Sequence, residues 1–312
     1  MKYIKRIIFI SCLSISTVVG YWGFYGHKLI AEWSVYSLPN EMFSFYKSNA
    51  NHIISASILP DILKNSVPLE FCRHYIDLDV ANDTIENLYF DVDSCLKIET
   101  CANRGVLPFI IESEFYELVI AFRNKDPKSI LRQSGMLSHY CSDLCVPLHT
   151  TENYDGQLTG QKGIHALWES YLVERYTFKY DLYDISAVLE TDLDHRILQD
   201  LYISNQLVDP LLKAHQNCQK EFENYTHGFY ERKGQIKEGY SEVFQECFHD
   251  KVSHQIEGQL RRSIQLTSDL WYSAWILADK PNLDSLETPD FIKENAKMPP
   301  VLHKNYDKRH HE

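Results

Sequence analysis

The chain has 312 residues, of which 44% are hydrophobic, so it can bury a large core and shows no general sign of intrinsic disorder. Its formal net charge of −12 argues against a basic groove for nucleic acid, although metal ions in a site would reverse that sign locally and keep a phosphate substrate open. Helical periodicity dominates wherever a period is visible, and neither a repeat of fixed length nor a glycine-rich phosphate loop is found. We therefore predict an all-α fold in a single compact domain.

The first 21 residues have the pattern of a secretory signal peptide. Three basic residues precede an apolar run (7–13), and small or β-branched residues follow up to Gly20. This leader predicts a secreted or periplasmic protein, with cleavage after Gly20 or Tyr21. Lipidation at Cys12 and an uncleaved anchor are the less favoured alternatives, and no stable membrane span is predicted once the leader is removed.

Two segments carry apolar residues at helical spacing, 115–122 and 256–275. Pro281 follows the second segment, and the chain beyond it has scattered polar residues and proline and ends in KRHHE. These features predict a helical domain over residues 22–280 and a loose C-terminal tail over residues 281–312.

The centre of the chain contains residues that can bind a metal, in the segments LSHYCSDLCVPLH and GIHALWESY. They are His139, Asp143, His149, His165 and Glu169. Residues 139 and 143 are four apart, as are 165 and 169, so each pair shares one face of a helix. One such pair alone is more often a capping or surface pair, but two together favour a ligand set. Nitrogen and oxygen donors without thiolate are typical of catalytic zinc.

The loop regions between these pairs fit the same interpretation. Pro147 ends the first helix because it lacks an amide hydrogen and clashes with the preceding turn, so His149 can fold back from a loop. The turn-rich stretch 153–163 then joins the two ligand helices. A site with several zinc ions needs three or four donors for each ion, and further candidates lie upstream. They are Trp22, His27, Asp61 and His74.

The chain has 8 cysteines, and removal of the leader takes away Cys12. The remaining number is odd, so at least one thiol is free or pairs outside the chain. We predict disulfides in an oxidising compartment and two cysteines packed in the core beside the first ligand helix, although sequence alone does not fix the connectivity. The predicted pairs are Cys95 with Cys101 and Cys218 with Cys247, and the core cysteines are Cys141 and Cys145.

These motifs, in this order, resemble the zinc-dependent phospholipase C and single-strand-specific nuclease family. The short WGxxGH start of that family is matched by Trp22, Gly23, Gly26 and His27. Asp61 matches its bridging aspartate and His74 the ligand histidine that follows. The H-x3-D-x5-H run is matched by His139, Asp143 and His149. The resemblance runs from Trp22 to about Glu169, roughly half of the chain without its leader.

The resemblance implies an all-helical fold with three zinc ions bound between helices. One ion would be held by Asp61, His74, His139 and Asp143; a second by Trp22, His27 and Asp143; and the third by His149, His165 and Glu169. The free amino group and carbonyl of Trp22 would be ligands, which requires cleavage after Tyr21. The ions would activate a water that attacks phosphorus, with Asp61 and Lys64 as catalytic residues. Ser142 stands where the nucleases usually carry glycine.

The family contains both lipid and nucleic-acid hydrolases, and the sequence carries signals for each. Lys64, and Tyr75 with Asp77, are placed as in the nucleases, where an aromatic and an aspartate hold a nucleobase. A core aromatic, a surface acid and a solvated lysine are the structural alternatives for these residues. Glu169 replaces the nuclease aspartate, and the short interval from His149 resembles the bacterial phospholipases. We therefore favour phospholipase C on phospholipid over a single-strand nuclease or 3′-nucleotidase.

A different class of protein fits the same composition. The histidines and acids would then be relics of an enzyme in a secreted helical binding protein without activity. No protein partner is predicted from the sequence. A phosphodiester substrate, either phospholipid or single-stranded nucleic acid, is the partner that the motifs indicate.

Overall fold

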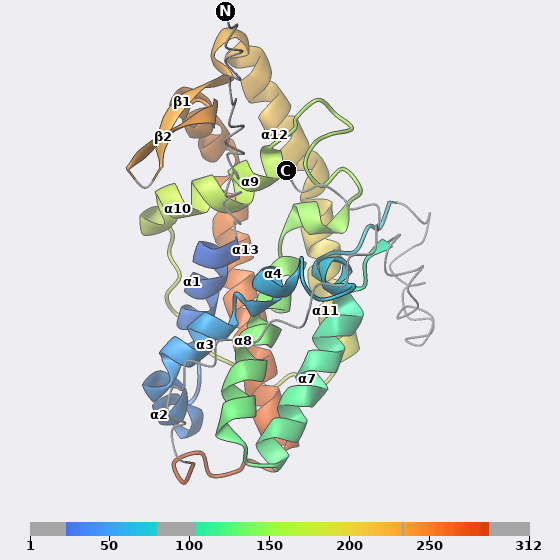
Figure 1. Ribbon diagram of the computed structural model, residues 1–312, viewed down its shortest axis with the longest axis vertical. Helices are drawn as coiled ribbons and strands as arrows, with labels where there is room; N and C mark the ends of the chain where they lie inside the picture. Colours follow the sequence, from blue (N-terminus) through green and yellow to red (C-terminus); the bar gives the residue numbers. More distant parts are fainter. Residues whose placement is uncertain (1–22, 80–103, 233, 287–312) are drawn as a thin grey trace, which may run out of the picture.

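Helices make up most of a computed structural model that describes residues 23–79, 104–232 and 234–286 (Figure 1). The predicted all-α class is confirmed, and the only sheet among the described residues is a small hairpin that the sequence analysis did not predict. The N-terminal helices are α1 (Gly23–Tyr36), α2 (Asn40–Ser48), α3 (Ala50–Ala56), α4 (Leu59–Leu63) and η1 (Glu70–His74). The central ones are α7 (Leu107–Arg123), α8 (Pro127–Leu144), η3 (Pro147–Thr150), α9 (Ile164–Ala166), η4 (Leu167–Tyr171), α10 (Leu172–Tyr176) and η5 (Thr177–Lys179). The C-terminal elements are α11 (Leu193–Gln206), α12 (Val208–Glu221), η6 (Glu223–Tyr225), β1 (His227–Arg232), β2 (Gln235–Tyr240) and α13 (Glu242–Leu277).

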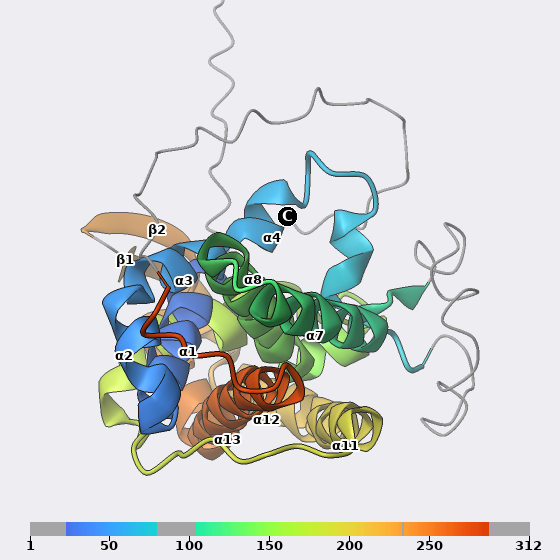
Figure 2. The same ribbon diagram turned by 90° about the horizontal axis from the view of Figure 1, so that it is seen from below.

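Helix α8, which carries the first predicted ligand pair, has clear sequence signals at both ends. The Asp126 carboxylate accepts hydrogen bonds from the amides of Lys128 and Ser129 at 3.1 and 3.3 Å, and Pro127 occupies the first turn. The helix ends at Leu144, shortly before Pro147, as predicted. It contacts α3, α7 and α13, and Figure 2 shows it beside α7. Its ligand half is therefore buried on several sides.

The long helix α13 organises two hydrophobic clusters. Ser241 caps its N-terminus by accepting a hydrogen bond from the Phe244 amide at 3.3 Å. Its C-terminal half, with Leu270 and Trp271, packs in a first cluster with α7 and α8, and its N-terminal half, with Phe244 and Phe248, packs in a second cluster with α9, η4 and α12. The predicted stripe over 256–275 is confirmed as helix, and the helix begins earlier than the stripe.

Asp143 and His149 lie on either side of the point where the chain passes between these two clusters. Leu144 belongs to the first cluster, and Val146 and Leu148 belong to the second. The chain therefore crosses from one cluster to the other between Asp143 and His149. Polar side chains at such a junction are shielded from water by apolar groups on both sides, which strengthens every electrostatic contact among them.

Disulfide bonds agree with the prediction in one case. Cys218 and Cys247 are bonded and join α12 to α13, and Cys141 and Cys145 are free and buried, both as predicted. Cys72 is also disulfide-bonded, which the sequence analysis did not foresee. The predicted pairing of Cys95 with Cys101 lies outside the described residues, as do the leader and most of the predicted tail. No described helix has both the length and the apolarity needed to cross a membrane.

Candidate metal centre

The structure brings together every predicted metal ligand that it describes. They form three groups: His27, His139 and Asp143; Asp61, His74 and His139; and His149, His165 and Glu169. Within each group, one donor atom from each residue lies within 4.8 Å of the others. The third group contains the same residues as one set that the resemblance implied, and the second contains three of the four residues of another, without Asp143. Trp22, the remaining predicted ligand, lies outside the described residues.

Asp143 is the carboxylate at the centre of the cluster. Its Oδ2 lies 3.0 Å from His74 Nδ1 and 3.2 Å from His139 Nε2. Its Oδ1 lies 3.4 Å from His27 Nε2 and 3.7 Å from His149 Nδ1. The Asp143 side chain is only 1% exposed. One buried carboxylate therefore faces imidazoles from four separate segments, which is the position expected of a bridging ligand.

The helix that carries His165 and Glu169 is wound more widely than an α-helix. After one turn of α9, the backbone continues as a π-helix through η4, and such turns are frequent at functional sites. The Glu169 carboxylate contacts His165 within this helix and lies 3.4 Å from His149 Nε2 across the gap to η3. The two ring nitrogens of His149 and His165 are 3.2 Å apart. This third group is thus as compact as the Asp143 cluster.

The outer ring nitrogens of most of these histidines are held by hydrogen-bond acceptors. Nδ1 of His139 donates to the Ser57 carbonyl at 2.8 Å, Nδ1 of His149 to the His74 carbonyl at 2.6 Å, and Nδ1 of His165 to the Tyr154 carbonyl at 3.1 Å. In its neutral form, each of these rings then presents the lone pair of Nε2 to its group. Such outer partners orient metal-binding histidines and fix the tautomer.

The distances inside the groups fit zinc. Two donors at about 2.05 Å from a tetrahedral zinc lie about 3.3 Å apart. His139 Nε2 and His74 Nδ1 are 3.0 Å apart, and the nitrogen-to-carboxylate distances around Asp143 start at 3.0 Å. Two ring nitrogens that both present lone pairs at this distance repel each other unless a cation lies between them. The residues present therefore fit the ions that the motifs imply.

The charges in the cluster are strongly coupled. Burial by itself would raise the pKa of Asp143, but His139, His149 and its hydrogen bonds lower the pKa well below its ordinary value. Burial lowers the pKa of His74 to about 3 and that of His27 well below its ordinary value. For His149, burial is outweighed by attraction to Glu169 and Asp143, which raises its pKa to about 9. Without a metal, His149 therefore carries a proton near neutral pH.

Zinc binding is expected to release this proton. The pKa of His149 in the folded, zinc-free protein, about 9, lies above the ordinary value of 6.5, so near pH 7 zinc must displace a proton to bind the neutral imidazole. Zinc affinity should then rise with pH until the pH passes about 9. Calorimetric zinc titrations in buffers of different ionisation enthalpy measure the number of protons released. A release near pH 7 that vanishes at about pH 10 is expected, and no release near pH 7 would contradict the assignment of His149.

The predicted site residues that are not metal ligands, Lys64, Tyr75 and Asp77, belong to none of the three groups. Lys64 follows α4 and is half-buried. Burial raises the pKa of Asp61, and the charges of His139 and Lys64 offset this effect only in part. Tyr75 is 5% exposed and packs in the first cluster, and Asp77 is 0% exposed. The burial of Tyr75 favours the core alternative over a ring that stacks on a nucleobase.

Sequence reasoning missed the polar contacts that Glu70 and Ser142 make with the candidate ligands His74 and His27. Glu70 is buried, accepts a hydrogen bond from the Tyr140 hydroxyl, and has its Oε1 3.8 Å from His74 Nε2. The spacing of four between Glu70 and His74 was a signal of the same kind as that of His139 and Asp143. Ser142 contacts His27, and no spacing rule could have identified this contact because the two residues are far apart in the sequence.

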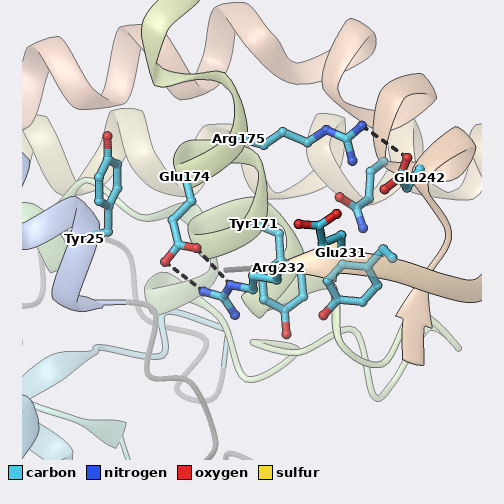
Figure 3. A pocket seen from close by; sticks show the side chains of 9 residues that line it. Tyr25, Tyr171, Glu174, Arg175, Glu231, Arg232 and Glu242 are labelled. Atoms are coloured by element: carbon cyan, nitrogen blue, oxygen red, sulfur yellow. Dashed lines mark hydrogen bonds and ion pairs between the residues drawn. The ribbon is translucent and has the colours of Figure 1, made fainter. Parts of the chain in front are cut away.

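A separate cleft of about 370 Å³ lies between α1, α10, the hairpin and α13 (Figure 3). It is lined mainly by tyrosine and charged side chains, among them Tyr25, Tyr171, Glu174 and Arg232. Glu174 accepts two hydrogen bonds from Arg232, each of 2.9 Å, and the Arg232 guanidinium stacks 4.2 Å from the Tyr171 ring centre. None of the predicted metal ligands lines this cleft, so it is distinct from the candidate metal centre.

Comparison with known proteins shows likeness in structure only. No family model and no curated protein matches the sequence. Among solved structures, the alpha-toxin of Clostridium perfringens, isolated from avian strain SWCP, matches with a TM-score of 0.53 and 15% identity, over 83% of this chain and 66% of the toxin chain. The alpha-toxin of Clostridium absonum gives a TM-score of 0.49 and 13% identity, over 84% of this chain and 66% of that chain. The chain thus spans 66% of the length of these toxins. Its helical fold is similar to that of the matched part of the Clostridium perfringens toxin.

Proposed function

We propose that this protein is a zinc-dependent hydrolase of phosphoric ester bonds, of the phospholipase C type. The observation that carries the proposal is the convergence of five histidines and three carboxylates from α1, α4, η1, α8, η3 and the α9–η4 helix into three adjacent groups. The resemblance of their order and spacing to the zinc phospholipase C and nuclease family supports it. The likeness of the fold to a clostridial alpha-toxin agrees with the same conclusion.

The residues of the chain have separable roles in this proposal. Bound zinc ions would supply Lewis acidity and lower the pKa of a water to near neutrality. Asp143 stays anionic and orients four imidazoles. Asp61 is less tightly held, 3.9 and 4.0 Å from the nearest imidazole nitrogens of His74 and His27, and burial raises its pKa. We therefore assign Asp61 to proton transfer and Lys64 to binding an anionic phosphoryl oxygen.

Phospholipid is the substrate class that we favour. Tyr75, the predicted base-stacking residue, is packed in the core, which supports this choice over a nuclease. Glu169, in place of the nuclease aspartate, and the short interval between His149 and His165 favour the phospholipase branch. Secretion belongs to the same proposal, because the predicted leader over residues 1–21 fits an enzyme that acts outside the cytoplasm.

A substrate panel tests the proposal with one preparation of zinc-loaded protein. Rates are compared on phosphatidylcholine vesicles, single-stranded DNA, a 3′-nucleotide and bis-p-nitrophenyl phosphate. We expect phosphatidylcholine to be hydrolysed fastest and H139A to lose hydrolysis of every substrate, because His139 belongs to two of the three groups. Faster cleavage of single-stranded DNA or of the 3′-nucleotide would move the assignment to the nuclease branch. Equal, background rates for wild type and H139A would indicate a binding protein without activity.

A further inference from the structure

The environment of His27 differs from that of three other histidines in the cluster. His139, His149 and His165 direct their outer nitrogens to backbone carbonyls, whereas Nδ1 of His27 lies 2.5 Å from the Ser142 hydroxyl oxygen. Both residues are buried, His27 at 2% and Ser142 at 1% exposure. The contact joins α1 to α8 one residue before Asp143.

The direction of this hydrogen bond follows from the number of hydrogens available. A serine hydroxyl has one hydrogen to donate and two lone pairs that accept. The Ser142 hydroxyl lies 2.9 Å from the Ser138 carbonyl and 2.7 Å from the His139 carbonyl, and neither carbonyl can donate. Its hydrogen is therefore used within α8, as is common for serine in a helix, and it accepts the hydrogen on Nδ1 of His27.

This arrangement fixes the tautomer of His27. With the hydrogen on Nδ1, the Nε2 lone pair faces Asp143 Oδ1 at 3.4 Å and Asp61 Oδ2 at 4.0 Å. The ring is also stacked on His139, with centroids 3.9 Å apart, so its plane is fixed as well as its tautomer. The lone pair of His27 Nε2 thus lies near two carboxylate oxygens, and a cation bound beside them would be attracted to all three atoms.

We propose that Ser142 is a positioning residue that holds His27 in its metal-binding tautomer and orientation. Ser142 thereby tunes the affinity of one of the three ions only, the ion bound by His27 and Asp143. The inference rests on the proposed function, since it requires the metal site. It assigns a role to a side chain at a position where the nucleases that the sequence resembles usually carry glycine. A glycine has no hydroxyl to accept the hydrogen of His27.

The test is a competition of zinc-loaded protein against a chromophoric chelator, which counts the ions and measures the affinity of each. S142A is expected to weaken one of three ions by about 10- to 100-fold and to leave the other two unchanged, a loss typical of outer partners of metal ligands. S142T, which keeps the hydroxyl, should restore wild-type affinity. S138A is the matched control, because Ser138 lies one turn earlier in α8 and is buried, and the hydroxyl that the variant removes donates to the Gly135 carbonyl.

Each outcome separates the role of Ser142 from the proposed function. If wild-type protein binds no zinc, the proposed function fails. If wild type binds three ions and S142A retains all of them as tightly as S138A, the role of Ser142 is refuted. A loss of affinity in S142A that S142T does not restore would also refute it, because packing rather than the hydroxyl would then be responsible. Should S142A fail to fold, S142G makes the same comparison.

Discussion

Replacement of Asp143 by asparagine is expected to remove at least one zinc ion and nearly all hydrolysis. Asp143 Oδ1 and Oδ2 face four imidazoles at 3.0 to 3.7 Å, and an amide in its place presents one neutral oxygen and two hydrogens. A metal ion stabilises the transition state by several kcal/mol, so its loss lowers the rate by about 10³-fold or more. Zinc content by elemental analysis and the rate on bis-p-nitrophenyl phosphate give the two readouts.

D269N is the matched control for this change. Asp269 is also a fully buried carboxylate, but it accepts hydrogen bonds from Arg196, Gln265 and the Val188 amide, and it belongs to none of the three groups. D269N should therefore lower stability and leave the zinc content unchanged. If D143N kept three ions and hydrolysed within about tenfold of wild type, Asp143 would have no role as a bridging ligand.

Removal of zinc by a chelator is expected to abolish hydrolysis and to lower the melting temperature by a large amount. A single ion present at about 1,000 times its dissociation constant stabilises the folded state by about 4 kcal/mol. For a domain of this size, that corresponds to a shift of roughly 8 to 16 °C, and further ions add to it. Without cations, Asp61, Asp143 and Glu169 stay buried close to imidazoles that are held for metal binding, which is a costly arrangement.

Differential scanning calorimetry before and after chelation measures this shift. Zinc should restore both the melting temperature and the activity, whereas magnesium should restore neither, because histidine-rich groups do not suit a hard cation with octahedral geometry. D143N should respond less to the chelator than wild type does. An unchanged melting temperature after complete removal of zinc would mean that the three groups are stabilised by hydrogen bonds and protons alone.

The proximity of the central candidate ligands was predictable because their signals are local. Four-residue spacing places His139 with Asp143, and His165 with Glu169, on single helix faces, and Pro147 sets the point at which α8 must end. The convergence of these segments with His27, Asp61 and His74 came only from the resemblance. Helical spacing says which residues share a face, but it does not say which helices meet.

Other features depend on contacts that spacing does not encode. The hairpin of β1 and β2 lacks a continuous alternation of apolar and polar residues, since Phe229 and Ile236 are exposed while Tyr230 and Tyr240 are buried. Its turn relies on Gly234, whose φ of 74° favours glycine. The bond from Ser142 to His27 joins residues 115 positions apart. These features follow from tertiary packing and therefore required the structure.

X-ray diffraction from crystals of zinc-loaded protein, recorded just above and just below the zinc absorption edge, tests the metal centre most directly. Three anomalous peaks are expected, each about 2 Å from nitrogen and oxygen atoms of one of the three ligand sets that the resemblance implies, two of which share Asp143. Absence of anomalous density beside Asp143, or zinc found only at surface histidines, would contradict a zinc-dependent active site.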